Sequence, residues 1–61
     1  MTIEAIVASQ EEHRKLKQLC VERDQEFEVL DQETINVAVE DDRLDAFTDL
    51  MDDHDFAWRL I

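Results

Sequence analysis

The chain of 61 residues contains no glycine and no proline. Glycine adopts the positive φ angles of tight turns at the lowest steric cost, so turns of that kind must here use Asn36 or an aspartate. This composition disfavours a fold with many β-hairpins and favours helices joined by short polar segments. It also excludes the Gly-rich loops that bind phosphate groups.

The segment from Asp41 to Ile61 has the clearest helical pattern. Its apolar side chains recur every three or four residues, as on one face of an α-helix. That face comprises Leu44, Phe47, Leu50, Met51, His54, Ala57, Trp58 and Ile61. An acidic face on the other side comprises Asp42, Asp45, Asp49, Asp52 and Asp53. Because a short carboxylate can accept the free amides of a first turn, Asp41 or Asp42 is the expected N-cap.

Two apolar residues of this predicted helix, Phe56 and Leu60, project from its acidic side. Three explanations fit these residues. The helix frays before them, a terminal segment covers them, or they form a second apolar contact for another subunit or a partner protein. With two residues of the main apolar face they form the candidate partner-binding set. That set is Phe56, Trp58, Leu60 and Ile61.

The preceding part of the chain contains one further strong helical signal. Ser9 and Glu12 have the spacing of a capping box, which indicates either a fresh helix start or a kink in a continuing helix. A charged helix with a narrow apolar seam is expected to continue from there to about Leu30. The seam comprises Leu16, Leu19, Cys20, Phe27 and Leu30. Residues 3–8 and 34–39 fit both helical spacing and the apolar alternation of strands, and we favour helix for both.

The predicted fold is therefore all-α, a single domain spanning residues 1–61. It is a helical hairpin of two or three helices, with a long N-terminal helix, a short connecting helix and an amphipathic C-terminal helix. The alternative is a β-α-β-α arrangement with short strands at 3–8 and 34–39, which would pair in parallel. A parallel pair of only two strands is poorly stable alone.

The size of the chain favours association. Small domains of this length are marginally stable and usually depend on disulfides, a metal or a partner subunit. A single cysteine cannot form an intrachain disulfide, and no zinc-type ligand set is present. The wide apolar face at the C-terminus also exceeds the narrow N-terminal seam. These observations predict a homodimer or an obligate partner protein.

The charge of the chain limits its partners. Seventeen acidic and six basic residues give a formal net charge of −11 at pH 7. Direct binding to nucleic acid or to an anionic membrane is disfavoured, because phosphate contacts need cations. A basic partner protein, including a nucleic-acid-binding protein, is favoured instead. No basic N-terminal region with a long apolar core and no apolar run of membrane-spanning length is seen, so a cytoplasmic location is expected.

Catalytic, cofactor-binding and metal sites are not expected. Cys20 and His13 lie two helical turns apart and lack a third group that would complete a catalytic site. The cluster from Asp52 to Asp55 includes His54, but its side chains spread around a helix and lack EF-hand spacing. We therefore expect no catalytic residue, no cofactor and no metal ligand.

Two functions fit these features. The first is a non-enzymatic protein-protein interaction module that regulates its partner through apolar helix faces. The second is an acidic inhibitor that mimics nucleic acid and occupies the basic groove of a DNA- or RNA-binding protein. The composition is similar to that of small acidic inhibitors from phages and mobile elements, but no diagnostic motif accompanies this likeness.

Overall fold

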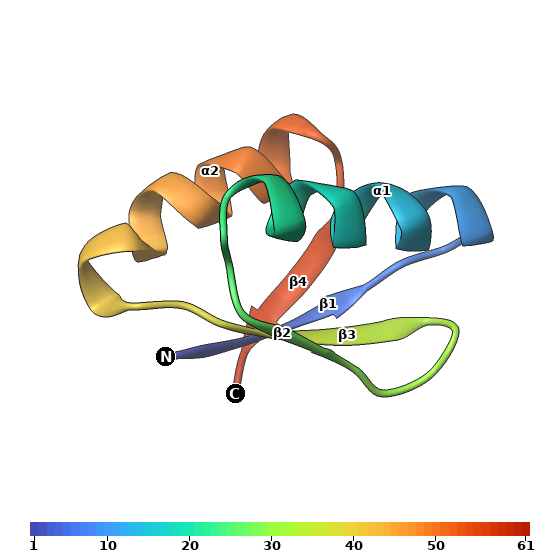
Figure 1. Cartoon of the computed structure of the whole chain (residues 1–61), viewed down its shortest axis with the longest axis horizontal. Helices are drawn as coiled ribbons and strands as arrows, with labels where there is room; N and C mark the ends of the chain where they lie inside the picture. The colour runs from blue at the N-terminus through green and yellow to red at the C-terminus, as the bar shows by residue number, and fades with distance from the viewer.

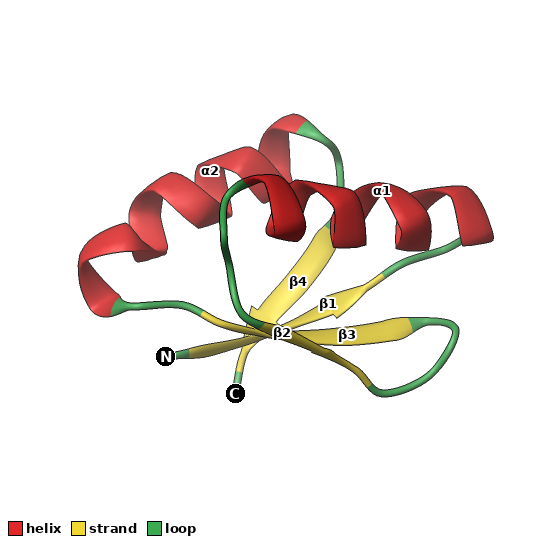
Figure 2. Cartoon of the chain, in the orientation of Figure 1, coloured by secondary structure: helices red, strands yellow, loops and turns green.

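The protein is a mixed α/β domain, described for all residues 1–61 by a computed structural model (Figure 1). Its elements are β1 (Thr2–Ile6), α1 (Gln10–Glu22), β2 (Phe27–Val29), β3 (Thr34–Ala38), the 3₁₀ turn η1 (Asp41–Arg43), α2 (Leu44–Asp53) and β4 (Ala57–Leu60). The four strands form one antiparallel sheet in the order β2-β3-β1-β4. Both helices cover the same face of this sheet (Figure 2). The topology is the split β-α-β arrangement of ferredoxin-like domains, and the all-α prediction is wrong.

The two central strands arise from the segments whose sequence fitted both helix and strand. Ile3 pairs with Val37 and Ala5 with Ile35, and all four side chains are buried. β-Branched side chains on alternating positions suit a half-buried strand, so burial against the helices selects the strand conformation here. The alternative with strands at 3–8 and 34–39 placed these two strands, but in parallel, and it omitted β2 and β4. They are antiparallel because the β2–β3 hairpin reverses the chain.

The hydrophobic core lies between the sheet and the helices. It comprises Ile3, Ala5, Val7, Leu16, Cys20, Ile35, Val37, Val39, Phe47, Met51 and Phe56. No polar or charged residue is buried. The apolar side of α2 therefore packs into a core that it shares with the strands and α1, and not into the two-helix seam that the helical hairpin required. The difference in width between the C-terminal apolar face and the N-terminal seam is consequently no longer a reason to expect a homodimer. The homodimer itself remains a prediction.

The start of α1 follows the capping signal in the sequence. Ser9 is the N-cap, and its hydroxyl oxygen accepts the backbone N–H of Glu12 at 3.2 Å. The Glu12 carboxylate reaches one residue beyond the N-cap and accepts the N–H of Ala8 at 2.8 Å. Of the two interpretations of the capping box, a fresh helix start is the one found in the structure, and the helix favoured for residues 3–8 does not precede it.

Both helices end in the same way, on an aspartate with positive φ. In α1, Asp24 has φ 53°, and the next residue, Gln25, donates its N–H to the Cys20 carbonyl at 2.7 Å. In α2, Asp55 has φ 59°, and Phe56 makes the equivalent bond. This is the Schellman motif, in which glycine is the usual residue. The predicted extensions of the helices to Leu30 and Ile61 are therefore wrong.

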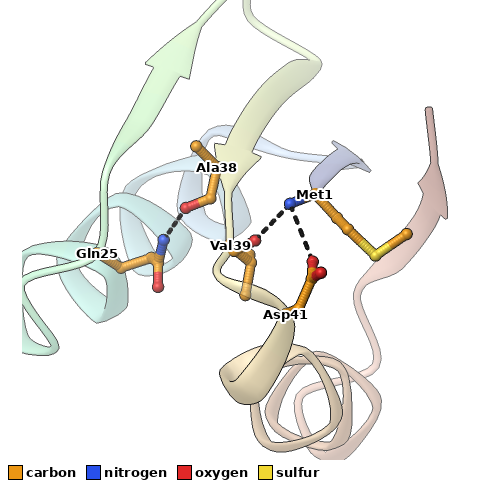
Figure 3. A network of polar contacts seen from close by, with 5 residues as sticks. All are labelled: Met1, Gln25, Ala38, Val39 and Asp41. Carbon is orange, nitrogen blue, oxygen red and sulfur yellow. Dashed lines mark hydrogen bonds and ion pairs between the residues drawn. The ribbon is translucent and has the colours of Figure 1, made fainter.

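Polar contacts fix the chain on either side of the β3–η1 connection (Figure 3). The amide side chain of Gln25 donates a hydrogen bond to the carbonyl oxygen of Ala38. The amino group of Met1 donates to the Val39 carbonyl at 2.6 Å and lies 3.7 Å from the Asp41 carboxylate. The segment after α1, the end of β3 and the start of η1 are thereby held together.

Candidate interaction surfaces

The acidic surface of the domain is the exposed side of η1 and α2. We define it by Asp42, Asp45, Asp49, Asp52 and Asp53, all of which are exposed. At 100° per residue, the four members within α2 fall on a stripe opposite the buried Phe47 and Met51. The predicted acidic side chains thus share one outward side of α2, although this helix is shorter than expected.

The charge of this region is concentrated and almost unpaired. Residues 40–55 contain eight acidic side chains and one basic side chain, Arg43, which gives a formal charge of −7. The chain has only two ion pairs, Arg59 with Glu4 and the Met1 amino group with Asp41. No lysine or arginine side chain therefore forms an ion pair with a member of the acidic surface. Aspartates in the last turn of α2 also oppose the helix dipole, so their position does not favour the helix.

The candidate partner-binding residues are divided between core and surface. Phe56 is only 5% exposed and belongs to the core, so it is not available to a partner. Trp58 is half-buried, and its indole N–H donates to the Asp52 carboxylate at 3.0 Å. Leu60 and Ile61 are 48% and 61% exposed. The predicted helical cluster does not exist, and the three outer residues belong to β4 and its end.

The outer edge of β4 is a feature that the helical interpretation of the sequence missed. β4 pairs with β1 alone, in an antiparallel register that sets Trp58 opposite Ala5. The Ile61 N–H donates to the Thr2 carbonyl at 3.1 Å, which fixes which residues of β4 face β1. Because antiparallel pairs alternate, the backbone groups of Trp58 and Leu60 point away from the sheet.

The uncovered face of the sheet carries a polar row across all four strands. Glu28, Asn36, Glu4 and Arg59 lie directly opposite one another in the register. The Arg59 Nε donates to the Glu4 carboxylate at 2.8 Å, while Asn36 Oδ1 is buried without a hydrogen-bond partner. This row would have followed from alternation in the strands, had all four been recognised.

The groups considered for catalysis and metal binding have other surroundings in the structure. Burial raises the pKa of the Cys20 thiol from 9.0 to about 11, so the nucleophilic thiolate is scarce at neutral pH. The His13 Nε2 lies 3.1 Å from the Asp31 carbonyl oxygen, and the His54 ring is 5.9 Å from that of Phe56. No group of three or more histidine, cysteine, aspartate or glutamate residues is placed to hold a metal ion.

The helices are also too short and too polar for any of them to cross a lipid bilayer. No protein-family model matches the chain, and no curated protein or solved structure matches it. Fold and surface chemistry are thus the basis for inferring its function.

Proposed function

We propose that this domain is a non-enzymatic protein-binding module that regulates a partner protein, and that its acidic surface contacts a basic region of that partner. The observation that supports this most directly is the formal charge of −7 in residues 40–55, whose acidic side chains form no ion pair with a lysine or arginine side chain. Like charges at this density repel one another and reduce the stability of a compact chain. A basic partner relieves that repulsion, and the negative charge of the acidic surface attracts it from a distance.

The binding surface differs from the one expected for a helical hairpin. Phe47 and Met51 on the apolar side of α2 are buried against the sheet, so this side of the helix cannot enter a partner's groove. The exposed side of α2 is the acidic surface, which accordingly takes the place of an apolar helix face in this proposal. Complementary charge of this kind contributes to association rate and specificity and is weakened by salt.

A second candidate function, mimicry of nucleic acid, is favoured by the spacing of the carboxylates. The four acidic residues between Asp45 and Asp53 span about 12 Å along the helix axis, since each residue rises ~1.5 Å. One charge therefore occurs about every 4 Å, which is near the ~3.4 Å per phosphate along one DNA strand. In this case the regulated partner is a DNA- or RNA-binding protein.

Two charge variants of the domain test the proposed function. The first replaces Asp42, Asp45, Asp49 and Asp53 with asparagine. The control replaces four exposed glutamates elsewhere, Glu11, Glu22, Glu28 and Glu33, with glutamine, which gives the same change in net charge. Each protein is immobilised and used to capture binding proteins from the source cell at low salt, with identification by mass spectrometry. Thermal unfolding verifies that both variants fold.

We expect the wild type and the glutamate control to retain the same protein and the aspartate variant to lose it. Equal retention by all three proteins would contradict a role for the acidic surface. Elution by added duplex DNA or RNA would favour the mimicry candidate, because the competitor and the acidic surface then occupy the same groove. Retention that resists the nucleic acid but falls with salt favours the regulatory module.

A further inference from the structure

We propose that the outer edge of β4 binds an extended, basic segment of the partner protein, which adds to the sheet as a fifth strand. This inference rests on the proposed function, because it names a second contact of the same partner. The segment would pair antiparallel or parallel with Trp58 and Leu60 through backbone hydrogen bonds. Addition of a strand to an exposed sheet edge is a common mode of peptide recognition.

The backbone geometry of β4 provides the hydrogen-bonding groups. Ala57 and Arg59 are opposite Ile6 and Glu4, and alternation directs their N–H and C=O groups toward β1. Trp58 and Leu60 therefore present one N–H and one C=O each along the outer edge. An exposed edge of this kind is a ready template for another strand.

The side chains at this edge provide a contact for an added strand. Trp58 and Leu60 lie opposite the buried Ala5 and Ile3, so both point to the helix-covered side of the sheet. Leu60 is 48% exposed and Trp58 is half-buried beside α2. Alternate side chains of an added strand would cover this apolar pair.

The charge beside the edge selects a basic occupant. The Asp52 carboxylate lies 3.0 Å from the indole nitrogen of Trp58, so the acidic surface of α2 borders the edge directly. The only cation of β4, Arg59, lies on the opposite side of the sheet and pairs with Glu4. A second copy of this chain would instead bring another formal charge of −11 to the same place.

The other free edge of the sheet offers a matched comparison. β2 has three residues, and it lies at the far side of the sheet from β4. The Leu30 N–H donates to the Thr34 carbonyl and the Ala38 N–H to the Glu26 carbonyl, so Val29 presents its N–H outward as Leu60 does. Proline at either position removes an outward donor without removing a hydrogen bond of the sheet, as edge strands permit.

The probe is a synthetic octapeptide of alternating lysine and valine, titrated at low salt against the domain. Emission from Trp58, the only tryptophan of the chain, reports binding. A glutamate-valine octapeptide controls for charge. A lysine-proline octapeptide has the same charge but cannot pair as a strand. Amide hydrogen exchange with and without the lysine-valine peptide locates the contact.

We expect the lysine-valine peptide to bind at least about tenfold more tightly than either control, since both charge and strand pairing contribute. It should protect the amides of Trp58 and Leu60 from exchange. Leu60→Pro should weaken its binding about tenfold, whereas Val29→Pro should leave it unchanged. Circular dichroism verifies folding, and the exchange measurement on the wild type decides the outcome if Leu60→Pro does not fold.

Several results would overturn the inference. The lysine-proline peptide could bind as tightly as the lysine-valine peptide, or the lysine-valine peptide could leave amide exchange at Leu60 unchanged. Val29→Pro could weaken binding as much as Leu60→Pro. Sedimentation could also show a dimer whose β4 amides are protected without any peptide. The proposed function fails independently, when the aspartate variant of the acidic surface captures the same partner as the wild type. If the aspartate variant loses that partner while Leu60→Pro does not affect peptide binding, the proposed function stands and the proposal of strand addition at β4 is rejected.

Discussion

Phe56 donates its backbone N–H to the carbonyl oxygen of Met51 at 2.9 Å, and the side chains of both residues are buried in the core. The bond spans the end of α2 and turns the chain from the helix into β4. A hydrophobic contact between these two positions is a regular companion of the Schellman motif. The pair thus determines that residues 57–60 pair with β1 and do not extend the helix.

Replacement of Phe56 with alanine should severely destabilise the domain. Truncation of a buried phenylalanine costs about 3–5 kcal/mol, which is a large part of the ~5–15 kcal/mol that stabilises a typical domain. Urea unfolding followed by circular dichroism measures the loss. The control is Ile61→Ala at an exposed position, for which a change within about 0.5 kcal/mol is expected. Similar effects of the two substitutions would show that Phe56 is an exposed contact residue after all.

Glycine at Asp55 should stabilise the domain. Asp55 has φ 59°, a region in which glycine avoids the steric cost of a β-carbon, so a gain of about 0.5–1 kcal/mol in the free energy of unfolding is expected. Asp49→Gly removes the same charge from the interior of α2 and should cost about 0.3 kcal/mol, because aspartate stands only slightly above glycine in helix propensity. Thermal unfolding of both variants measures the difference. A lower midpoint for Asp55→Gly than for the wild type would contradict the proposed role of the turn.

The position of the α1 start is marked in the sequence because Ser9 and Glu12 form a local capping signal, but that signal alone does not distinguish a fresh start from a kink in a longer helix. The ends of the two helices could not be predicted from the sequence. The usual stop residue, glycine, is absent from the chain, and the aspartates at positions 24 and 55 resemble their many acidic neighbours. The helical pattern of apolar residues also continues through Trp58 and Ile61, although the chain has already turned at Asp55. Local periodicity therefore predicted α2 correctly and β4 incorrectly.

The strands β1 and β3 were ambiguous for a different reason. Ile3, Ala5 and Val7 alternate as a strand requires, but a strand is stable only when partners are present. β1 and β3 pair with each other, and their outer partners are the segments 27–29 and 57–60, whose sequence pattern predicts helices. The acidic surface could be found from local sequence because its spacing within α2 is helical. The free edge of β4 could not be predicted in this way, because it depends on the order of the strands in the sheet.

The Cys20 thiol should be unreactive in the folded domain and should make stability sensitive to alkaline pH. Its pKa is raised from 9.0 to about 11 by burial, so the unfolded chain loses this proton first. Stability is therefore unaffected by this group below pH 9 and falls between pH 9 and pH 11. Urea unfolding across this range, compared with Cys20→Ala, isolates the contribution. Parallel pH profiles for the two proteins would exclude it.

Alkylation of Cys20 with iodoacetamide provides a second measurement on the same group. Modification should be slow under native conditions and become fast in urea, because the thiol is exposed only when α1 leaves the sheet. Fast modification of the folded domain would show that the helix opens readily and that this part of the core is less stable than the burial of Cys20 implies.

The hydrogen bond between Trp58 and Asp52 should couple β4 to the end of α2. Asp52→Ala removes the acceptor of the indole N–H, whereas Asp53→Ala removes the same charge from the adjacent position of the helix. Both substitutions relieve an unfavourable charge at the helix C-terminus. We expect Asp52→Ala to be less stable than Asp53→Ala by about 1 kcal/mol, the net value of one hydrogen bond. Its tryptophan emission should also shift to longer wavelength as the indole becomes more exposed. Identical stability and emission of the two variants would mean that the bond does not hold β4 against α2 in solution, and that Trp58 is kept in place by its strand alone.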